Sequence, residues 1–253
     1  MKKIIRSILR ALGLYTFAID IENKLITLIK KPERKKFYGQ FIKKDSLCFD
    51  VGANKGNRTE IFLELGAKVV AVEPQQECYL LLQEKFGDKI NLITKGLGEK
   101  ESTEKLYVSG STLISSFSKS HVDMMQEERF KGANWNKTVE IQMTTLDNLI
   151  KQFGVPDFCK IDVEGYEYDV LKGLSQPLKA LSLEYIVPEN TQVLVDCLTH
   201  LNKLGNIECN FSYGESMQLN LPTWKNGKDM IDYIQTADFT ATSYGDVYIK
   251  FIS

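Results

Sequence analysis

The sequence predicts an α/β protein, in which a doubly wound, mostly parallel sheet of seven strands carries helices on both faces. From residue 46 onward, short apolar runs alternate with segments of helical periodicity, which is typical of a parallel sheet covered on both sides. The first run ends in "FDVGANKG", where two glycines bracket the start of a helical segment, as in a ligand-binding strand-to-helix turn. With 253 residues, 43% of them apolar, the chain can bury the core of one large domain.

Seven strands are expected in chain order. They lie at 46–51, 67–73, 90–96, 156–164, 180–187, 206–212 and 246–252. The helix after Gly56 is expected to turn Ile61, Phe62 and Leu65 inward, and the helix at 75–87 ends on Gly87, a suitable C-terminal cap.

Three segments depart from this alternation. Residues 1–40 are expected to form a helical extension in front of a domain spanning 41–253. A polar stretch at about 110–137, between strand-like runs at 104–109 and 138–143, is expected to cross the carboxyl edge of the sheet as a lid. A second insertion, at about 213–245, separates the last two strands.

The N-terminal segment 1–22 is predicted to be an amphipathic helix, because isoleucines and leucines recur at helical spacing with four basic residues between them. It lacks a convincing cleavage site, and no apolar run approaches the ~20 residues of a membrane span. It either docks on the domain or on a sister subunit, making a homo-oligomer, or rests on an anionic membrane. The basic cluster at 30–36 is expected to be a solvated face or a subunit contact.

Charge and cysteine content narrow the class of partner. The formal net charge is −1, and no basic, aromatic-interleaved stripe is evident, so nucleic acid is an unlikely partner. Five cysteines without a C-x-x-C pair indicate buried, reduced thiols and a cytoplasmic protein. Two histidines and no His/Cys cluster argue against zinc, while a divalent cation held by carboxylates stays open.

The turn from Asp50 to Gly56 and the acid at Glu73 predict a nucleoside-bearing cofactor. Glu73 ends the second strand and lies 73 − 52 = 21 residues after Gly52, close to the ~20 expected for the acid that binds a ribose. The pattern is G-x-N-x-G, and Asp50 precedes its first glycine. An acid there disfavours a dinucleotide phosphate but suits a cofactor carrying a sulfonium and an ammonium group.

These residues resemble a known family. "FDVGANKGNRTEIFLELGAKVVAVEP", "TTLDNLI", "PDFCKIDVEGYEYDVLKG" and "SLEYI" together resemble the FkbM-type class I methyltransferases, over about residues 47–186. The resemblance implies a Rossmann-like fold, S-adenosylmethionine as cofactor and O-methylation of a hydroxyl on a small molecule or saccharide. It implies further that Asp50, Gly52, Asn54 and Gly56 line the methionine half of the cofactor and that Glu73 holds the ribose. Their neighbours Ala53 and Pro74 complete the predicted cofactor site.

A second group of charged residues lies in "CKIDVEG". If the strand stays regular to Glu164, then Lys160, Asp162 and Glu164 share one face of it. They either form a Lys160–Asp162 ion pair that braces the sheet or act on the acceptor. Asp162 is the first choice as the acceptor-orienting catalytic group, with Lys160 and Glu164 in support; a base role for any of the three, including a Lys160 of depressed pKa, or a carboxylate-held cation, stays open.

Weaker candidates surround the expected mouth of the site. Ser111 and Thr112 form a hydroxyl-rich turn that could touch cofactor or acceptor, and Glu184 either faces the acceptor or caps its strand. His121 is expected to be a solvated loop residue. Trp135 and Trp224 could stack on a ring or serve as packing anchors.

Two other classes of function compete with a methyltransferase. A nicotinamide-dependent oxidoreductase would share the strand, turn and acid but would need a third glycine and no acid at Asp50. A non-catalytic binding module could keep the cofactor fold, although buried acids would then serve no purpose there.

Overall fold

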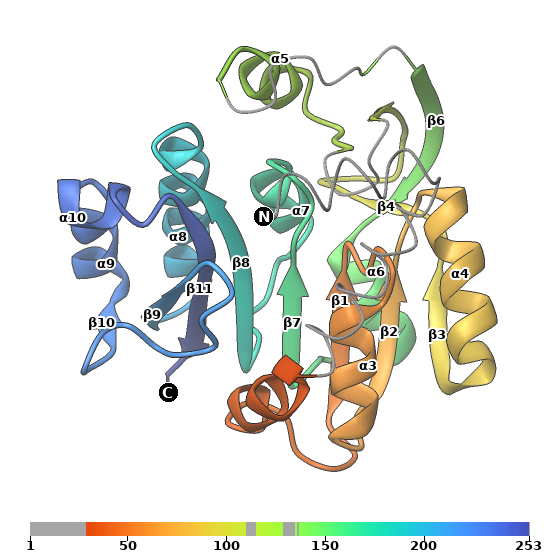
Figure 1. The fold of residues 1–253 in the computed structure, drawn as a ribbon, viewed down its shortest axis with the longest axis horizontal. Helices are drawn as coiled ribbons and strands as arrows, with labels where there is room; N and C mark the ends of the chain where they lie inside the picture. Colours follow the sequence, from red (N-terminus) through yellow and green to blue (C-terminus); the bar gives the residue numbers. More distant parts are fainter. Residues whose placement is uncertain (1–28, 110–114, 129–134, 136, 253) are drawn as a thin grey trace, which may run out of the picture.

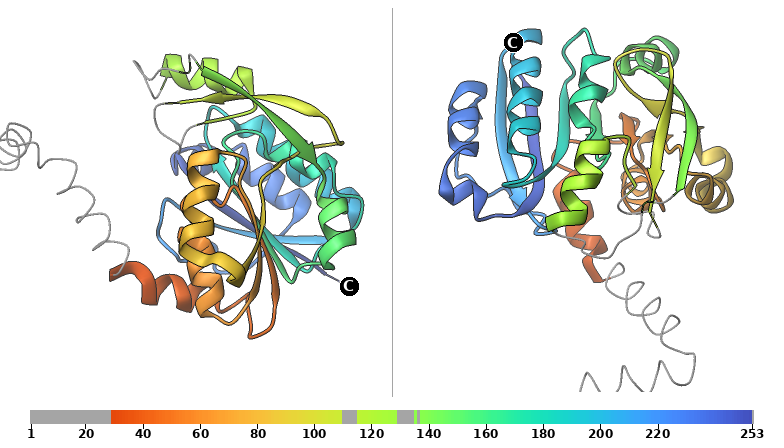
Figure 2. Two further views of the ribbon diagram at one scale, coloured as in Figure 1. Left: turned by 90° about the vertical axis from the view of Figure 1, so that its right-hand side faces the viewer. Right: turned by 90° about the horizontal axis from the view of Figure 1, so that it is seen from above.

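The structure is a computed structural model that describes residues 29–109, 115–128, 135 and 137–252. The predicted α/β architecture is confirmed: one large sheet runs through the molecule with helices on both faces (Figures 1 and 2). The predicted amphipathic helix at 1–22 lies outside the described residues. Among the described residues, no helix is long and apolar enough to cross a membrane.

The large sheet has eight strands rather than the expected seven. In spatial order they are β10 (Lys225–Asn226), β9 (Ile207–Tyr213), β11 (Tyr244–Phe251), β8 (Ala180–Ile186), β7 (Phe158–Ile161), β1 (Leu47–Val51), β2 (Lys68–Val72) and β3 (Ile90–Ile93). The five strands from β8 to β3 are parallel, whereas β11 is antiparallel to both β8 and β9. The extra strand, β10, pairs only two residues with β9, too short a run to show in the sequence pattern.

A small second sheet and one helix stand beyond the carboxyl ends of the parallel strands (Figure 1). This sheet comprises β4 (Gly96–Leu97), β6 (Lys137–Thr144) and β5 (Thr103–Val108), which confirms the strands expected on either side of the polar stretch. The helix is α5 (Lys119–Glu128), and it belongs to the predicted lid. Whether this segment opens and closes stays a prediction.

Helices cover the sheet in two layers (Figure 2). One layer holds a helix at 29–38 with α3 (Asn57–Glu64), α4 (Gln76–Phe86) and the short η1 (Gly87–Lys89) beside them. The other layer holds α6 (Leu146–Phe153), α7 (Glu167–Lys172), α8 (Thr191–Leu204), α9 (Gly227–Ile234) and α10 (Ala237–Thr240). As predicted, Ile61 and Phe62 of α3 are buried and α4 ends at Gly87.

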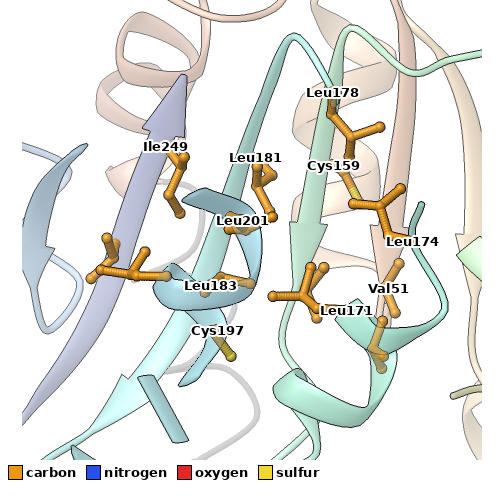
Figure 3. Packing of buried hydrophobic residues seen from close by; sticks show 14 of the residues in the cluster. Val51, Cys159, Leu171, Leu174, Leu178, Leu181, Leu183, Cys197, Leu201 and Ile249 are labelled. Atoms are coloured by element: carbon orange, nitrogen blue, oxygen red, sulfur yellow. The ribbon is translucent and has the colours of Figure 1, made fainter. Parts of the chain in front are cut away.

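Alternation along the strands sends successive side chains into two separate cores. Phe49 and Val51 of β1 face the α6–α10 layer, where Leu, Ile and Val side chains from strands and helices interlock (Figure 3). Cys48 and Asp50 face the other layer, which is rich in aromatic rings. Tyr38, from the segment expected to be an extension, is fully buried there, edge-on to Phe62 with ring centroids 5.1 Å apart. This part of the N-terminal segment therefore belongs to the domain core.

The turn after β1 needs glycine because of the protein's own atoms. Gly52 has φ +80°, and a Cβ there would lie 1.8 Å from the carbonyl oxygen of Asp162. Gly56 has φ +78°, and its Cβ would lie 2.4 Å from Cε2 of Phe86. Each glycine therefore makes room for a neighbouring segment of the protein, and Gly52 also lines the cavity described below.

Replacing Gly52 with alanine should cost the fold far more than the left-handed backbone alone explains. The matched control is Gly214→Ala, because Gly214 has φ +53° but its Cβ would meet nothing closer than 3.5 Å. We expect the control to lose about 1 kcal/mol of unfolding free energy and Gly52→Ala about 3 kcal/mol or more, measured by urea denaturation. Equal losses would show that the contact with Asp162 imposes no constraint.

Candidate functional site

A cavity of about 1040 Å³ opens at the carboxyl ends of β1, β2 and β7. Most of the predicted site residues line it: Asp50, Gly52, Ala53, Asn54, Glu73, Pro74, Lys160, Asp162, Glu164 and Glu184. Gly56 is not part of the lining, since it faces Phe86 and Leu82. Ser111 and Thr112 lie outside the described residues. The fold therefore gathers both predicted groups into one space.

Glu73 closes the cavity at the end of β2 and is 2% exposed. Its Oε2 accepts a hydrogen bond from the backbone N–H of Asn54 at 2.8 Å, and its Oε1 accepts one from that of Gln75 at 2.8 Å. Burial raises the pKa of Glu73 to about 7, although both hydrogen bonds oppose the shift. The carboxyl thus bridges the turns after β1 and β2.

Asp50 is buried in the sheet face below the turn. Its Oδ2 accepts a hydrogen bond from the hydroxyl of Thr59 at 2.5 Å, and Lys160 is its neighbour in the register of β1 and β7. Burial raises the pKa of Asp50, while Thr59 and Lys160 act in the opposite direction. The acid that appeared misplaced in the sequence is therefore held by a hydroxyl and a nearby cation.

Lys160 and Asp162 form an ion pair at the end of β7. The Lys160 Nζ is 2.5 Å from Oδ2 of Asp162 and 3.9 Å from Oδ1 of Asp246, a buried residue of β11. Burial alone would lower the pKa of Lys160, but Asp162 and Asp246 outweigh it and raise that pKa. A base role for a Lys160 of depressed pKa is therefore wrong, since the amine stays charged.

Three carboxyl groups converge above this ion pair. Asp162, Glu164 and Glu184 each offer an oxygen, and these oxygens all lie within 4.8 Å of one another. The pKa of Asp162 is lowered, because Lys160 and a hydrogen bond from Glu184 overcome the effect of burial. Burial and the charge of Asp162 raise the pKa values of Glu164 and Glu184 well above the usual range. Asp162 is thus the charged member, beside two carboxyls that tend to keep their protons.

Glu164 reaches this group by a different route from the expected one. β7 ends at Ile161, and Glu164 has φ +53°, so the strand does not stay regular to Glu164. The loop is fixed instead by Ser116, whose hydroxyl donates to the carbonyl oxygen of Glu164 at 2.6 Å. Glu167 also fixes it: its Oε1 accepts from the backbone N–H groups of Val163 and Gly165 at 3.1 and 3.2 Å.

His121 and the two tryptophans occupy structural positions. His121 is 5% exposed, so the expectation that it is solvated is wrong. Its Nδ1 lies 2.9 Å from Nδ2 of Asn190, within hydrogen-bond distance. The imidazole also packs against Gly165, where a Cβ would lie 2.3 Å from Nδ1. It joins α5 to the loop of Glu164 and Gly165. Trp135 packs with Val122 and Met125, and Trp224 lies under Lys250 at 4.0 Å. None of the three is among the residues that line the cavity.

Sequence reasoning missed an arginine pair at the same cavity. Arg58 of α3 donates from Nη2 to both oxygens of Glu215, at 2.6 and 2.8 Å, and Arg34 of the 29–38 helix donates from Nη2 to Oε2 at 3.1 Å. Arg34 is only 8% exposed, so the expectation that the 30–36 cluster is solvated is wrong at this residue. The only signal for this arginine pair in the sequence is the cluster of basic residues at 30–36.

The fold and the cavity define a class. Class I methyltransferases have a mostly parallel sheet that contains one antiparallel strand, here β11. They also have a glycine turn after β1, an acid at the end of β2 and further acids at the end of the strand that corresponds to β7. A family model described as the methyltransferase FkbM domain matches residues 50–239. The chain therefore belongs to the FkbM methyltransferases and is an S-adenosylmethionine-dependent methyltransferase, which confirms the resemblance and sets the oxidoreductase alternative aside.

Solved structures with a similar fold include methyltransferases, but the similarity is low. A precorrin-6y C5,15-methyltransferase from Geobacter metallireducens is 8% identical, with 87% of each chain covered and a TM-score of 0.44. A TehB-like SAM-dependent methyltransferase from Corynebacterium glutamicum is 8% identical, with 87% of this chain and 88% of that chain covered and a TM-score of 0.46. No curated protein matches the sequence. At these TM-scores the relatives carry no argument about the substrate.

The cavity residues fit S-adenosylmethionine. Glu73 places a buried carboxyl at the end of β2, where the ribose hydroxyls would need an acceptor, and Asp50 places a second buried carboxyl below the turn, on the side of the cationic amino-acid end. The backbone at Gly52 carries no side chain into the space.

Glu167 should make the protein less stable as pH rises through neutrality. Burial raises its pKa from 4.5 to about 7, so between these values the folded state binds more protons than the unfolded state, and stability falls with rising pH. Glu167→Gln keeps the oxygen that holds Val163 and Gly165 but does not titrate. We expect the loss of unfolding free energy between pH 5 and pH 8 to shrink by up to about 3 kcal/mol in this variant.

The control is Glu84→Gln, an exposed position on α4, which should leave the pH profile unchanged. Denaturant unfolding at a series of pH values measures both. A Glu167→Gln profile as steep as that of the wild type would contradict the assignment.

Proposed function

We propose that the protein transfers the methyl group of S-adenosylmethionine to a hydroxyl oxygen of a small molecule or saccharide. The observation that carries the proposal is the charged Asp162, fixed by the buried Lys160, beside two further carboxyls in the same cavity as Glu73. A carboxylate held in this position can accept the proton of a hydroxyl group on the molecule that is methylated.

On this proposal, the cofactor is held by its two ends. Glu73 accepts hydrogen bonds from the ribose hydroxyls, and Asp50 with the backbone of Gly52, Ala53 and Asn54 faces the methionine half. Bound there, S-adenosylmethionine supplies an electrophilic methyl group.

The acceptor side of the reaction then falls to Asp162. Its charged carboxylate accepts the hydrogen bond of the acceptor hydroxyl, orients that oxygen and takes its proton as the new C–O bond forms. Lys160 keeps Asp162 ionised and in place, while Glu184 and Glu164 offer further polar contacts to the acceptor. The three carboxyl oxygens could also hold a divalent cation, which would polarise the hydroxyl instead.

The partner expected from this site is a small hydroxylated molecule rather than a macromolecule. The reacting groups lie inside a cavity, and the near-neutral charge of the chain gives no support to nucleic acid as acceptor. The five free, buried cysteines suit a reducing compartment such as the cytoplasm. Peripheral membrane contact and homo-oligomerisation through the N-terminal segment stay predictions.

The first test is calorimetric titration with S-adenosylhomocysteine, with NAD as the comparison ligand. We expect micromolar binding of the first alone, and a loss of about 1 to 3 kcal/mol of binding free energy in Glu73→Ala. Glu77→Ala, at an exposed position on α4, is the control and should bind as the wild type does. Absence of S-adenosylhomocysteine binding would overturn the proposal; binding without turnover on any hydroxylated acceptor would favour the binding module.

Asp162→Asn should separate binding from chemistry. The amide keeps the size of the carboxylate but has neither its charge nor its affinity for a proton, so we expect turnover to fall by about 10²- to 10⁴-fold. The affinity for S-adenosylhomocysteine should change less than tenfold. Mass spectrometry of methylated product and calorimetry measure the two effects, with Asp88→Asn, at an exposed position of η1 away from the cavity, as the matched control. A variant that turns over at the wild-type rate would contradict the role of Asp162.

A further inference from the structure

The pair formed by Arg34 and Arg58 has no part in the methyl transfer described above, yet both residues line the same cavity as Asp162. We propose that this arginine pair binds a carboxylate of the methyl acceptor, so that the acceptor is a hydroxylated organic acid. The inference rests on the proposed function, because it adds a second recognition point for the same acceptor.

The pair has more donors than the protein supplies with acceptors. In the hydrogen bonds among the described residues, each guanidinium reaches Glu215 through Nη2 alone. The Nε atoms of both arginines are buried and have no hydrogen-bond partner in the described part of the chain. A guanidinium presents five N–H donors in a planar fork that matches a carboxylate, and leaving a buried donor unpaired is costly. A second carboxylate in the cavity would add an acceptor for the guanidinium N–H groups that Glu215 leaves unused.

The charges point in the same direction. Two cations whose side chains are 10% and 12% exposed share one carboxylate, that of Glu215, which is 42% exposed. Lys160, Asp246 and Tyr38 also face Arg58. Lys160 is already paired with Asp162. Two largely buried guanidinium cations therefore share the single carboxylate of Glu215 as their hydrogen-bonded partner, and a further anion is favoured in such a place.

The position of the pair favours the acceptor over the cofactor. Glu73 ends β2 and Asp50 lies on β1, whereas Glu215 follows β9, on the far side of β7, β8 and β11. Glu215 therefore approaches the cavity from the β9 side, whereas Arg58 lies on α3, close enough to Asp50 for its charge to oppose the rise that burial causes in the pKa of that carboxyl. An acceptor bound between Asp162 and the arginines would present its hydroxyl at one end and its acid at the other. The methionine carboxylate of the cofactor offers the same chemistry, and the experiment must separate the two.

The test uses matched acids and neutral analogues on protein saturated with S-adenosylhomocysteine: glucuronate against glucose, and para-hydroxybenzoate against para-hydroxybenzyl alcohol. Binding is measured by saturation-transfer NMR and calorimetry, so no turnover is needed. We expect the acid of at least one pair to bind about tenfold or more tightly than its analogue, and Arg34→Gln and Arg58→Gln to remove that preference. Equal binding within both pairs, or no binding of either acid, would overturn the inference.

Glu215→Gln distinguishes a binding site from a structural brace. If the pair is a binding site, Glu215→Gln removes the carboxylate that competes for the guanidiniums, and acid binding should tighten. If the pair is only a structural brace, Arg34→Gln, Arg58→Gln and Glu215→Gln should all lower the melting temperature and leave the preference for the acid unchanged. Arg58→Lys serves where a glutamine variant does not fold: it keeps the charge but loses the fork, and should weaken the acid preference.

A last comparison addresses the cofactor directly. If Arg58→Gln weakens S-adenosylhomocysteine but not 5′-methylthioadenosine, which lacks the amino-acid portion, then the pair serves the cofactor and the inference is wrong. If the wild type binds S-adenosylhomocysteine but shows no preference for the acids, this inference is wrong and the proposed function stands. If the wild type does not bind S-adenosylhomocysteine, both the proposed function and this inference are wrong.

Discussion

The buried cation of Lys160 sets the arrangement of the whole site. A lysine at the centre of a parallel sheet, 3% exposed, is tolerated only where anions surround it, and Asp50, Asp162 and Asp246 lie on three neighbouring parts of the sheet. Burial raises the pKa values of Asp50 and Asp246, although Lys160 acts in the opposite direction, whereas the pKa of Asp162, in direct contact with Lys160, is lowered. Lys160 thereby acts on three carboxyl groups and holds one of them, Asp162, ionised at the cavity.

The backbone contact between two loops places that carboxylate against the cofactor turn. The N–H of Asp162 donates to the carbonyl oxygen of Val51 at 3.0 Å, and its own carbonyl fills the space that a side chain on Gly52 would take. The two loops leave adjacent strands and cannot move independently. If the proposed roles of these residues hold, β1–β7 pairing fixes the distance between the cofactor groups and the acceptor groups, on which catalysis by alignment depends.

The sequence predicted those parts of the site that follow from local pattern. Asp50, Gly52 and Glu73 lie at strand ends, and the alternation of apolar runs is enough to place strand ends at one edge of a sheet. Glu164 shows the limit of this reasoning: strand periodicity put it on the right face, but a left-handed residue and hydrogen bonds from Ser116 and to Glu167 bring it there. The glycine turn was located correctly, but the sequence did not show that it is crowded by atoms of segments about 30 and 110 residues away.

The arginine pair could not be predicted, because its members meet only in the folded chain. Arg34 and Glu215 are 181 positions apart, and each resembles an ordinary surface residue in its own segment. They are informative because two buried guanidinium groups converge on one carboxylate, that of Glu215, and this arrangement exists only in the folded chain. The acids around Asp162 and the cations around Glu215 give one cavity two chemically different ends. A molecule that satisfies both must carry a hydroxyl and an anion a fixed distance apart, which is a narrower requirement than either end imposes alone.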